Sequence, residues 1–464
     1  MNLLFLAPNP PSPVRVRPYQ LAQQLAARGH RLTVAAPLGG EDEARDLAGL
    51  QELAAATLGH RIARQRRVLS VAEGLLSRRP LQAAVAWDPR FARRLAAEVE
   101  AARVAETPYS IAHIEHLRAA RYALALQPHL PVVWDSVDSI TLLFEQALAQ
   151  SRSLKGRLLA AVDLRRTQRY EGYLVNRLGS VVVTAQADRR RLLELAEADR
   201  RRRHDDRGGN PGNKGSQSRT LEPRICVIPN GVDLARFAAR GMVREPDTIV
   251  LSGKMSYHAN VTAACFLVED VMPRVWARRP DARVVLAGAE PSREVRALAR
   301  RDARVEVTGF VEDLGAVLSR ATVAVAPLVY GAGIQNKILE AMATETPVVA
   351  SELAARSIGV AAGRELLVGR SAVDMAEGLV SMLEDPERAK AMGAAGRAYV
   401  ERHHSWEAAA QAFETVYAEA AALFTPSPSP HFTPGSNSHL QTTLAKPKPD
   451  PNPAPDPPSP TRPR

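Results

Sequence analysis

Short apolar runs alternate with stretches of helical spacing along most of this chain. Residues 2–7 form an apolar run, residues 18–28 carry apolar side chains at helical spacing, and residues 31–36 form the next apolar run. Gly29 is placed to end the intervening helix. Further strands are predicted at 111–115, 131–135 and 180–184. Strand–helix alternation with nearly continuous apolar strands is typical of parallel sheets covered by helices on both faces.

The same pattern starts again in the second half of the chain. Strands are predicted at 248–252, 282–287, 305–308, 322–327 and 347–350, and helices at 261–278, 292–300 and 336–344. The sequence therefore predicts an α/β protein with two doubly wound, Rossmann-like domains, residues 1–235 and 236–405, facing across a cleft. A last helical stretch at 406–424 follows the second series, and we expect it to return to the first domain.

Two segments lack any apolar pattern. Residues 200–220 begin with four arginines and continue with glycine, asparagine and serine, which predicts a mobile surface insert within the first domain. The last 40 residues, 425–464, contain 13 of the 34 prolines and few aliphatic residues. Because such a segment buries too little apolar surface to offset its ordering entropy, it is predicted to be a disordered tail.

Composition narrows the class of protein. The 464 residues include 45% hydrophobic and 24% charged residues, which is ordinary globular usage. There is no basic signal-peptide start and no apolar run of about 18 residues, so a cytoplasmic protein is expected. The two cysteines, Cys226 and Cys265, lack the spacing of a disulfide scaffold or zinc site. The net charge of +11 favours anionic partners such as nucleotides, nucleic acid or a membrane surface.

The segment after the strand predicted at 322–327 carries the strongest chemical signal. Gly331 and Gly333 let the backbone approach a ligand, and the following helix directs unpaired N–H groups at it. Lys337 adds a cation in the first turn, and Glu340 lies on about the same face, where a carboxylate can accept both ribose hydroxyls. These features suit a nucleotide. The plain alternative is a tight turn followed by an exposed Lys337–Glu340 ion pair.

Here the sequence resembles the GT-B glycosyltransferases of family 4, the glycosyl transferases group 1. The resemblance covers most of residues 1–424 and is carried by motifs in family order: Pro229-Asn230-Gly231-Val232-Asp233, Ser252-Gly253-Lys254-Met255, Gly309-Phe310-Val311, Gly333-Ile334-Gln335-Asn336-Lys337, Leu339-Glu340-Ala341-Met342-Ala343 and His404-Ser405-Trp406. The stretch at 333–337 is similar to members associated with exopolysaccharide assembly. In the first domain, Arg17-Pro18, Asp135-Ser136-Val137-Asp138-Ser139 and residues 25–30 are also similar.

The resemblance implies a retaining, metal-independent transferase without a cofactor. Its donor substrate would be a nucleotide-diphosphate sugar in the second domain, and its acceptor, a glycan or lipid-linked sugar, would lie in the first. Lys254 aligns with a basic residue that contacts the diphosphate, Glu340 with the ribose ligand, and Val311 with a position near the base. The donor-binding set implied is Gly253, Lys254, Val311, Gly331, Gly333, Ile334, Gln335, Asn336, Lys337 and Glu340.

The first domain offers one candidate for the reaction centre. His116, at the end of Ala112-His113-Ile114-Glu115-His116, is the histidine expected to approach the transferred sugar, and with Lys254 it forms the predicted catalytic pair. An alignment shifted by one residue would select Glu115 instead. His113 is expected to point into the strand. The plain alternative is that His116 is a surface histidine with satisfied hydrogen bonds.

Three departures from the family pattern stand out. Ala332 occupies the position of the family's first glutamate, Ala259 and Asn260 occupy the neighbourhood of its second basic residue, and Lys337 is a candidate to replace that charge. The glycine-rich first loop is a proline loop at 8–13, which cannot offer consecutive amide donors, so any help to a phosphate would come from Arg15 and Arg17. A catalytically weakened nucleotide-sugar sensor or scaffold is therefore the alternative function.

Other partners follow from the remaining patterns. Residues 60–69, 73–79 and 155–169 mix basic and apolar positions, which favours either peripheral contact with the inner face of an anionic membrane or a solvated helix face. Nucleic acid is not an expected partner, since aromatic residues are only 5% of the chain. A dinucleotide-dependent dehydrogenase is not supported, because prolines follow the first predicted strand where Gly-x-Gly-x-x-Gly would stand.

Overall fold

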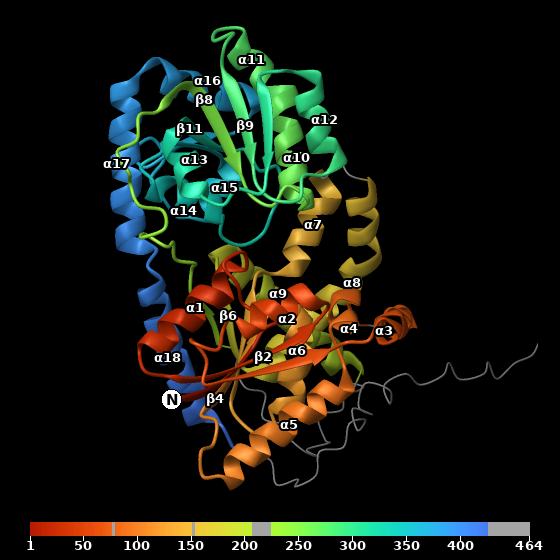
Figure 1. Cartoon of the computed structure of the whole chain (residues 1–464). Helices are drawn as coiled ribbons and strands as arrows, with labels where there is room; N and C mark the ends of the chain where they lie inside the picture. The colour runs from red at the N-terminus through yellow and green to blue at the C-terminus, as the bar shows by residue number, and fades with distance from the viewer. Residues whose placement is uncertain (77–78, 151–153, 207–223, 426–464) are drawn as a thin grey trace, which may run out of the picture. The chain divides into compact units, whose positions relative to one another are not determined.

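The structure is a computed structural model that describes residues 1–76, 79–150, 154–206 and 224–425. The tail predicted at 425–464 and the insert after residue 206 lie outside these residues, apart from Thr425. Two parallel sheets organise the described chain (Figure 1). We call each sheet with its covering helices a lobe, the first lobe holding the N-terminal sheet and the second lobe the other.

The first lobe is built on a seven-stranded sheet with the order β3-β2-β1-β4-β5-β6-β7, and every described pairing in it is parallel. Its central strands are almost completely buried, as the continuous apolar runs predict. The strands are β1 (Asn2–Leu6), β2 (Arg31–Leu38), β3 (Ala56–Arg61), β4 (Ile111–Glu115), β5 (Val132–Val137), β6 (Ser180–Val183) and β7 (Arg224–Val227).

The helices of the first lobe alternate with these strands along the chain. They are α1 (Val16–Ala27), α2 (Glu41–Ala48), α3 (Arg64–Leu76), α4 (Leu81–Val85), α5 (Pro89–Val104), α6 (His116–Leu126), α7 (Ile140–Gln150), α8 (Leu154–Leu178) and α9 (Gln186–Asp206).

The second lobe repeats the architecture with a six-stranded parallel sheet of order β10-β9-β8-β11-β12-β13. Its strands are β8 (Glu245–Ser252), β9 (Arg283–Ala287), β10 (Val305–Gly309), β11 (Ala321–Ala326), β12 (Val348–Ser351) and β13 (Leu367–Gly369). Its helices are α10 (His258–Phe266), α11 (Met272–Trp276), α12 (Arg293–Arg301), α13 (Leu314–Arg320), α14 (Asn336–Ala343), α15 (Glu352–Arg356), α16 (Ala372–Glu384) and α17 (Pro386–His403). The predicted α/β class with two doubly wound sheets is confirmed.

The final helix, α18 (Trp406–Leu423), packs within the core of the first lobe. Figure 1 shows it in blue beside the red α1, and it also contacts β4 and β5. Its buried side chains, including Phe413 and Tyr417, join Leu3 and Phe5 in one apolar cluster. The linker fits closely against its start, because a Cβ on Gly231 would lie 2.4 Å from the backbone nitrogen of Trp406.

Two predicted elements differ from the structure. The helix predicted at 261–278 begins at His258 and contains a π-helical turn, Leu267–Val271, before α11. Pro273 has no N–H to donate to the preceding turn, so the regular hydrogen-bond ladder changes there. Residues 200–206, predicted to open a surface insert, instead continue α9. Ion pairs at i,i+4 spacing, Arg201 with Glu197 and Arg203 with Asp199, support this extension.

Candidate active site

Both sheets reverse their strand order at one place, and the predicted site residues follow the strands at these places. In the first sheet the reversal lies between β1 and β4, and His116 comes directly after β4. In the second it lies between β8 and β11, where Lys254 follows β8 and the turn at 331–335 follows β11. Ligands of doubly wound sheets bind beyond the carboxyl ends of the strands at such switch points. The topology therefore directs attention to these segments.

Glycines line the carboxyl edge of the second sheet where the backbones approach one another. Gly253, after β8, has φ +139°, and Gly288, after β9, has φ +147°. A Cβ on Gly288 would lie only 1.8 Å from the carbonyl oxygen of Gly253, so only glycine fits there. Val311, the predicted neighbour of the base, follows Gly309 at the end of β10 and is partly exposed.

Lys254 lies at this edge with a partner that the sequence did not reveal. Its Nζ is 2.9 Å from Oε1 of Glu290, and the Lys254 side chain is 53% exposed. Ser256 donates a hydrogen bond to the other Glu290 oxygen at 3.1 Å. These two hydrogen bonds lower the pKa of Glu290. Lys254 is thus paired with a carboxylate from the loop after β9. An anionic ligand would compete with Glu290 for the Lys254 ammonium.

Lys337 lies in the first turn of α14, and its Nζ donates to Oδ1 of Asn260 at 2.6 Å. Asn260 in turn donates to the main-chain carbonyl oxygen of Lys254 at 3.0 Å, so Asn260 links the Lys337 ammonium to the backbone of Lys254. Burial lowers the pKa of Lys337 to about 8. Asn260 lies in the neighbourhood where the family carries its second basic residue. In the structure the Lys337 ammonium contacts the Asn260 side chain.

Glu340 follows one turn later on α14. Burial raises its pKa to about 7, and the positive charges of Lys337 and Arg236 oppose that rise. No ion pair links Lys337 to Glu340 in the part of the chain that the structure describes, so the plain alternative of an exposed ion pair is not what forms. The carboxylate remains available as a hydrogen-bond acceptor near the Lys337 ammonium.

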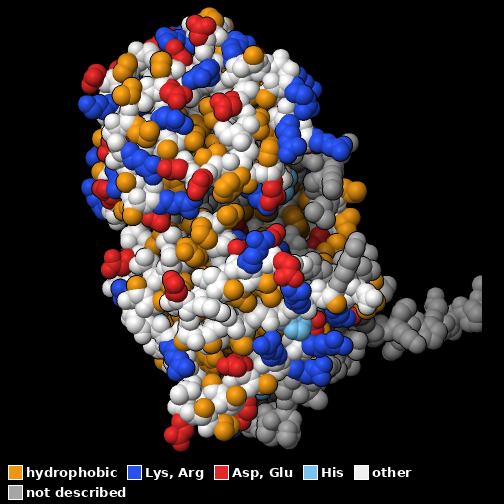
Figure 2. Space-filling model, viewed as in Figure 1, with side chains coloured by type: hydrophobic (Ala, Val, Ile, Leu, Met, Phe, Trp, Pro, Cys, Tyr) orange, Lys and Arg blue, Asp and Glu red, His pale blue; other side chains and the backbone are white. Residues whose placement is uncertain are grey.

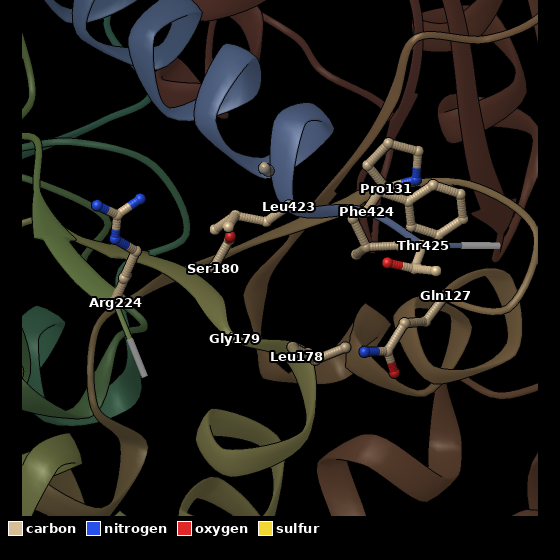
Figure 3. A pocket seen from close by; sticks show the side chains of 11 residues that line it. Gln127, Pro131, Leu178, Gly179, Ser180, Arg224, Leu423, Phe424 and Thr425 are labelled. Carbon is tan, nitrogen blue, oxygen red and sulfur yellow. The ribbon is translucent and has the colours of Figure 1, made fainter. Parts of the chain in front are cut away.

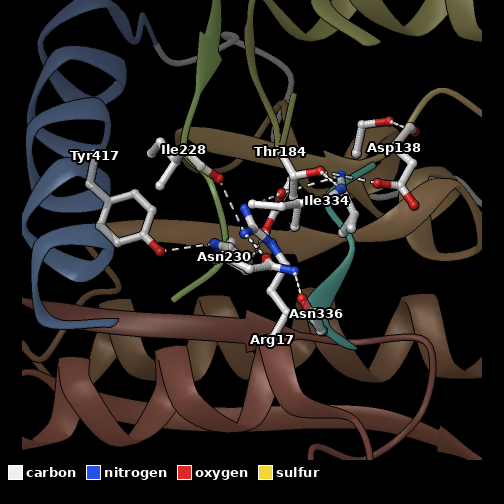
Figure 4. Close-up of polar contacts among 12 residues, drawn as sticks. Arg17, Asp138, Thr184, Ile228, Asn230, Ile334, Asn336 and Tyr417 are labelled. Atoms are coloured by element: carbon white, nitrogen blue, oxygen red, sulfur yellow. Dashed lines mark hydrogen bonds and ion pairs between the residues drawn. The ribbon is translucent and has the colours of Figure 1, made fainter. Parts of the chain in front are cut away.

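The turn from Gly331 to Asn336 contacts the first lobe directly (Figure 4). The N–H of Gly331 donates to Oε1 of Gln146 at 2.9 Å, and the N–H of Ile334 donates to Oγ1 of Thr184 at 3.3 Å. Asn336 accepts a hydrogen bond from Nδ2 of Asn230 at 2.8 Å. Figure 1 shows α7, which carries Gln146, extending toward the second lobe. The predicted donor-binding turn therefore lies at the boundary between the lobes.

Gln335, the residue that precedes α14, also lies in this turn. Its side-chain amide donates to the carbonyl oxygen of Ala332 at 3.4 Å, across the turn, and no side chain caps the helix there. The first N–H groups of α14 are therefore not satisfied by a capping side chain. An anion could accept hydrogen bonds from them.

His116 occupies an unusual backbone conformation. It is the first residue of α6, with φ +65°, which is rare for any residue other than glycine. Its Nδ1 accepts a hydrogen bond from the N–H of Arg118 at 3.2 Å, and burial with the nearby Arg118 charge lowers its pKa to about 3. Strained residues that the surrounding fold maintains cluster at functional sites. His116 is thus a neutral imidazole held at the switch point of the first sheet.

The neighbours of His116 have different surroundings. Glu115, the alternative from a shifted alignment, is buried, and burial with the Asp135 charge raises its pKa to about 8. His113 points into the core, as predicted: it is fully buried, stacks on Phe5 at 4.4 Å between ring centroids, and its Nδ1 is 2.9 Å from the Tyr417 hydroxyl.

Arg15 and Arg17 were expected to assist a phosphate. The contacts of Arg17 do not fit that expectation. Arg17 is buried and makes two hydrogen bonds to Asp135, at 2.8 and 3.1 Å, and one to Oδ1 of Asn230 at 2.6 Å (Figure 4). Arg15 pairs with Asp46 and Glu43. Arg17 therefore belongs to a buried ion pair inside the first lobe, whereas the Arg15 side chain is 33% exposed and pairs with two carboxylates.

Two further features bear on where a ligand could bind. A cavity of about 240 Å³ lies at the amino-terminal ends of β5, β6 and β7, beside the end of α18 (Figure 3). Its lining includes Gln127, Arg224 and Phe424 but none of the predicted site residues. No group of three or more His, Cys, Asp or Glu suited to a metal ion occurs among the described residues. On the face drawn in Figure 2, basic and acidic side chains are interspersed.

The residues missed by the sequence argument share one property. Glu290, Gln146 and Thr184 lie in segments far from their partners along the chain, and none belongs to a motif. Thr184 and Asp138 do follow β6 and β5 directly, so a search for polar residues at the carboxyl ends of parallel strands would have found them.

Two doubly wound lobes with parallel sheets form a GT-B fold, which solved glycosyltransferase structures share. Residues 246–385 match the family model described as "Glycosyl transferases group 1", which confirms the predicted resemblance over this segment. HepE of Anabaena, solved in complex with UDP, has the same fold, with a TM-score of 0.60 and 15% identity over 90% of this chain and 100% of that one.

Curated relatives match over a shorter segment. The phosphatidyl-myo-inositol mannosyltransferase of Mycobacterium tuberculosis is 30% identical over 217 residues, 43% of this chain and 56% of that protein. A GDP-mannose-dependent monoacylated alpha-(1-6)-phosphatidylinositol monomannoside mannosyltransferase of Corynebacterium glutamicum is 33% identical over 207 residues, 40% of this chain and 54% of that protein. The match thus spans about half the length of these relatives.

Proposed function

We propose that this protein is a retaining, metal-independent glycosyltransferase that uses a nucleotide-diphosphate sugar. The observation that carries the proposal is the cluster of Lys254, Asn260 and Lys337 beside the N-terminus of α14, with Glu340 one turn deeper. Two cations and a helix N-terminus suit a diphosphate, and a carboxylate at the next turn suits ribose hydroxyls. The names of the relatives and of the solved neighbour support the same donor class.

The proposed roles follow from the chemistry of each group. Departure of the diphosphate leaves negative charge on its oxygens, and fixed cations stabilise that charge without reorganisation. Lys337 and Lys254 supply this stabilisation, while Glu340 holds the ribose and Val311 lies beside the base. His116, uncharged because its pKa is about 3, offers a hydrogen bond to the transferred sugar rather than a proton at neutral pH.

Nucleotide binding tests the proposal most directly. In a thermal-shift assay UDP, GDP and ADP are compared at millimolar concentration, because a ligand that binds only the native state raises the melting temperature. One nucleotide should stabilise the wild type, and Glu340→Ala should lose that shift. Release of nucleotide from UDP-glucose or GDP-mannose then distinguishes a transferase from a non-catalytic sensor. Absence of any shift in the wild type would contradict the proposed donor site.

The pKa of Lys337 predicts how this binding depends on pH. In the free protein the ammonium form is lost as the pH rises through about 8, and a diphosphate prefers the ammonium form. The affinity for nucleoside diphosphate should therefore be highest below pH 8 and fall above it, by calorimetric titration between pH 7 and 9.5. Lys337→Met should bind more weakly and lack this inflection. An equal pH profile in both proteins would show that another group is responsible.

A membrane surface is the proposed site of action, on the cytoplasmic side, with a glycan or lipid-linked acceptor. One face of α8 exposes Leu158 (67%) and Val162 (47%) together with Arg157, Arg165 and Arg169, which helical spacing places side by side. A basic and apolar helix face binds anionic lipid. Two relatives are named for phosphatidylinositol substrates. No helix in the described ranges has the length and apolar character needed to cross a bilayer.

Vesicle pelleting tests this surface. We expect the protein to pellet with phosphatidylglycerol vesicles at low salt and to remain in solution at high salt or with phosphatidylcholine. The double change Leu158→Glu, Val162→Glu should abolish pelleting. Val373→Glu, at a position on α16 that is also 47% exposed, serves as the control and should pellet like the wild type. Lack of binding to anionic vesicles at low salt would refute the surface.

A further inference from the structure

A carboxylate of the first lobe lies directly against the donor-binding turn of the second. A Cβ placed on Gly333 would be 1.9 Å from Oδ1 and 2.6 Å from Cγ of Asp138. Gly333 also has φ +68°, so both its conformation and its space require glycine. Asp138 follows β5 in the first sheet, and Figure 4 shows it beside Thr184 and Ile334. The two lobes thus meet at this carboxylate.

Local structure holds Asp138 in place. Its Oδ1 accepts a hydrogen bond from Oγ1 of Thr184 at 3.2 Å. Its own N–H donates to the carbonyl oxygen of Ser136 at 2.8 Å, and the Ser136 hydroxyl donates back to the carbonyl oxygen of Asp138 at 3.0 Å. The intervening Val137 has φ +66°, a rare conformation for a β-branched residue. The strained backbone at Val137 thus sets the position of the Asp138 side chain.

The second oxygen of Asp138 also lies close to the turn, 2.9 Å from a Cβ placed on Gly333. Oδ2 accepts no hydrogen bond from the residues that the structure describes, and the side chain is partly exposed. Burial raises the pKa of Asp138, and the neighbouring Asp188 carboxyl has its own pKa raised by burial and by the charge of Asp138. The Tyr257 hydroxyl, at the start of α10, lies within electrostatic reach, since Asp138 adds to the rise in its pKa. Asp138 is thus a hydrogen-bond acceptor placed directly against the donor-binding turn.

A carboxylate at this position favours contact with some parts of a nucleotide sugar over others. A carboxylate repels a diphosphate and accepts strong hydrogen bonds from hydroxyl groups. The turn itself brings no carboxylate, since residue 332 is alanine. We propose that Asp138 contacts the hydroxyl groups of the transferred sugar and is a specificity residue for the donor. This inference rests on the proposed function, because it requires a nucleotide sugar at the turn.

The experiment separates the sugar from the nucleotide. Binding of UDP and GDP, and kcat/KM with UDP-glucose and GDP-mannose, are measured for the wild type, Asp138→Asn and the control Glu197→Gln. Glu197 is an exposed carboxylate on α9 that pairs with Arg201. Asp138→Asn should lower kcat/KM for the preferred sugar donor by about 10- to 100-fold, because a hydrogen bond to a charged group is lost. Binding of the nucleoside diphosphate should remain unchanged, and Glu197→Gln should match the wild type.

Deoxy analogues of the preferred donor give an independent measurement. Removing the sugar hydroxyl that Asp138 contacts should cost the wild type about as much as Asp138→Asn does, while the variant should be insensitive to that removal. Additive losses at every hydroxyl would overturn the proposal. So would unchanged kcat/KM in Asp138→Asn, or weaker binding of nucleoside diphosphate, which would mean that Asp138 only keeps the lobes together. A wild type that binds no nucleotide would instead refute the proposed function.

Discussion

Replacing Lys337 by methionine should lower kcat with the preferred nucleotide sugar by about 10²- to 10³-fold, the usual cost of removing one fixed stabiliser of transition-state charge. Methionine keeps the length of the side chain and removes only the charge. The ammonium is held by Asn260 at 2.6 Å in a buried setting, so its field at a diphosphate is weakly screened. Steady-state release of nucleotide measures the effect.

The same substitution at two other lysines provides a comparison for the decrease in kcat. Lys254→Met should cost about 10-fold, since its side chain is half-exposed and Glu290 already neutralises part of its charge. Lys390, an exposed residue of α17 that is outside the predicted donor-binding set, should tolerate the same change without effect. Turnover that survived the loss of both Lys254 and Lys337 would refute the diphosphate site as proposed.

The second lobe was largely predictable because its site is local in sequence. The end of the strand, the glycine turn and the part of the helix that carries Lys337 and Glu340 lie within residues 326–340, so spacing alone places them together. Predicted strands in both lobes differ from the observed ones by at most a few residues at their ends. Apolar runs fix buried parallel strands because both faces of each strand are covered.

Contacts between residues far apart along the chain could not be predicted in the same way. Arg17 was a candidate for phosphate contact, but its partners Asp135 and Asn230 lie 118 and 213 residues away along the chain. Lys254 and Glu290 are separated by 36 residues and by an entire helix–strand unit. Charge and residue type do not reveal such pairs. The strand order reveals them, because it brings the carboxyl ends of neighbouring strands to one edge.

These distant contacts also explain how Ala332 fits a functional site. A carboxylate missing from the turn itself can be supplied by the facing lobe, provided that glycine at 333 leaves room for it. The charge is then available only when the lobes meet. Asp138 of the first lobe therefore supplies the carboxylate that Ala332 of the second lobe lacks.

Replacing Arg17 by methionine should destabilise the first lobe by about 3–5 kcal/mol, because it leaves the buried Asp135 carboxylate without its partner. Arg17 also bonds to Asn230 and to the carbonyl oxygen of Ile228 at 3.3 Å, so the linker loses contacts as well. Urea denaturation followed by circular dichroism measures the change in the free energy of unfolding.

Comparison with an exposed pair makes the Arg17 result specific. Arg103 forms a two-point contact with Glu100 on the surface of α5, and Arg103→Met should leave the denaturation midpoint close to that of the wild type. The double change Arg17→Met, Asp135→Asn should recover part of the lost stability, because no buried charge is then left unpaired. If instead Arg17→Met were as stable as Arg103→Met, the buried pair would not stabilise the lobe, and Arg17 would again be a candidate for contact with substrate.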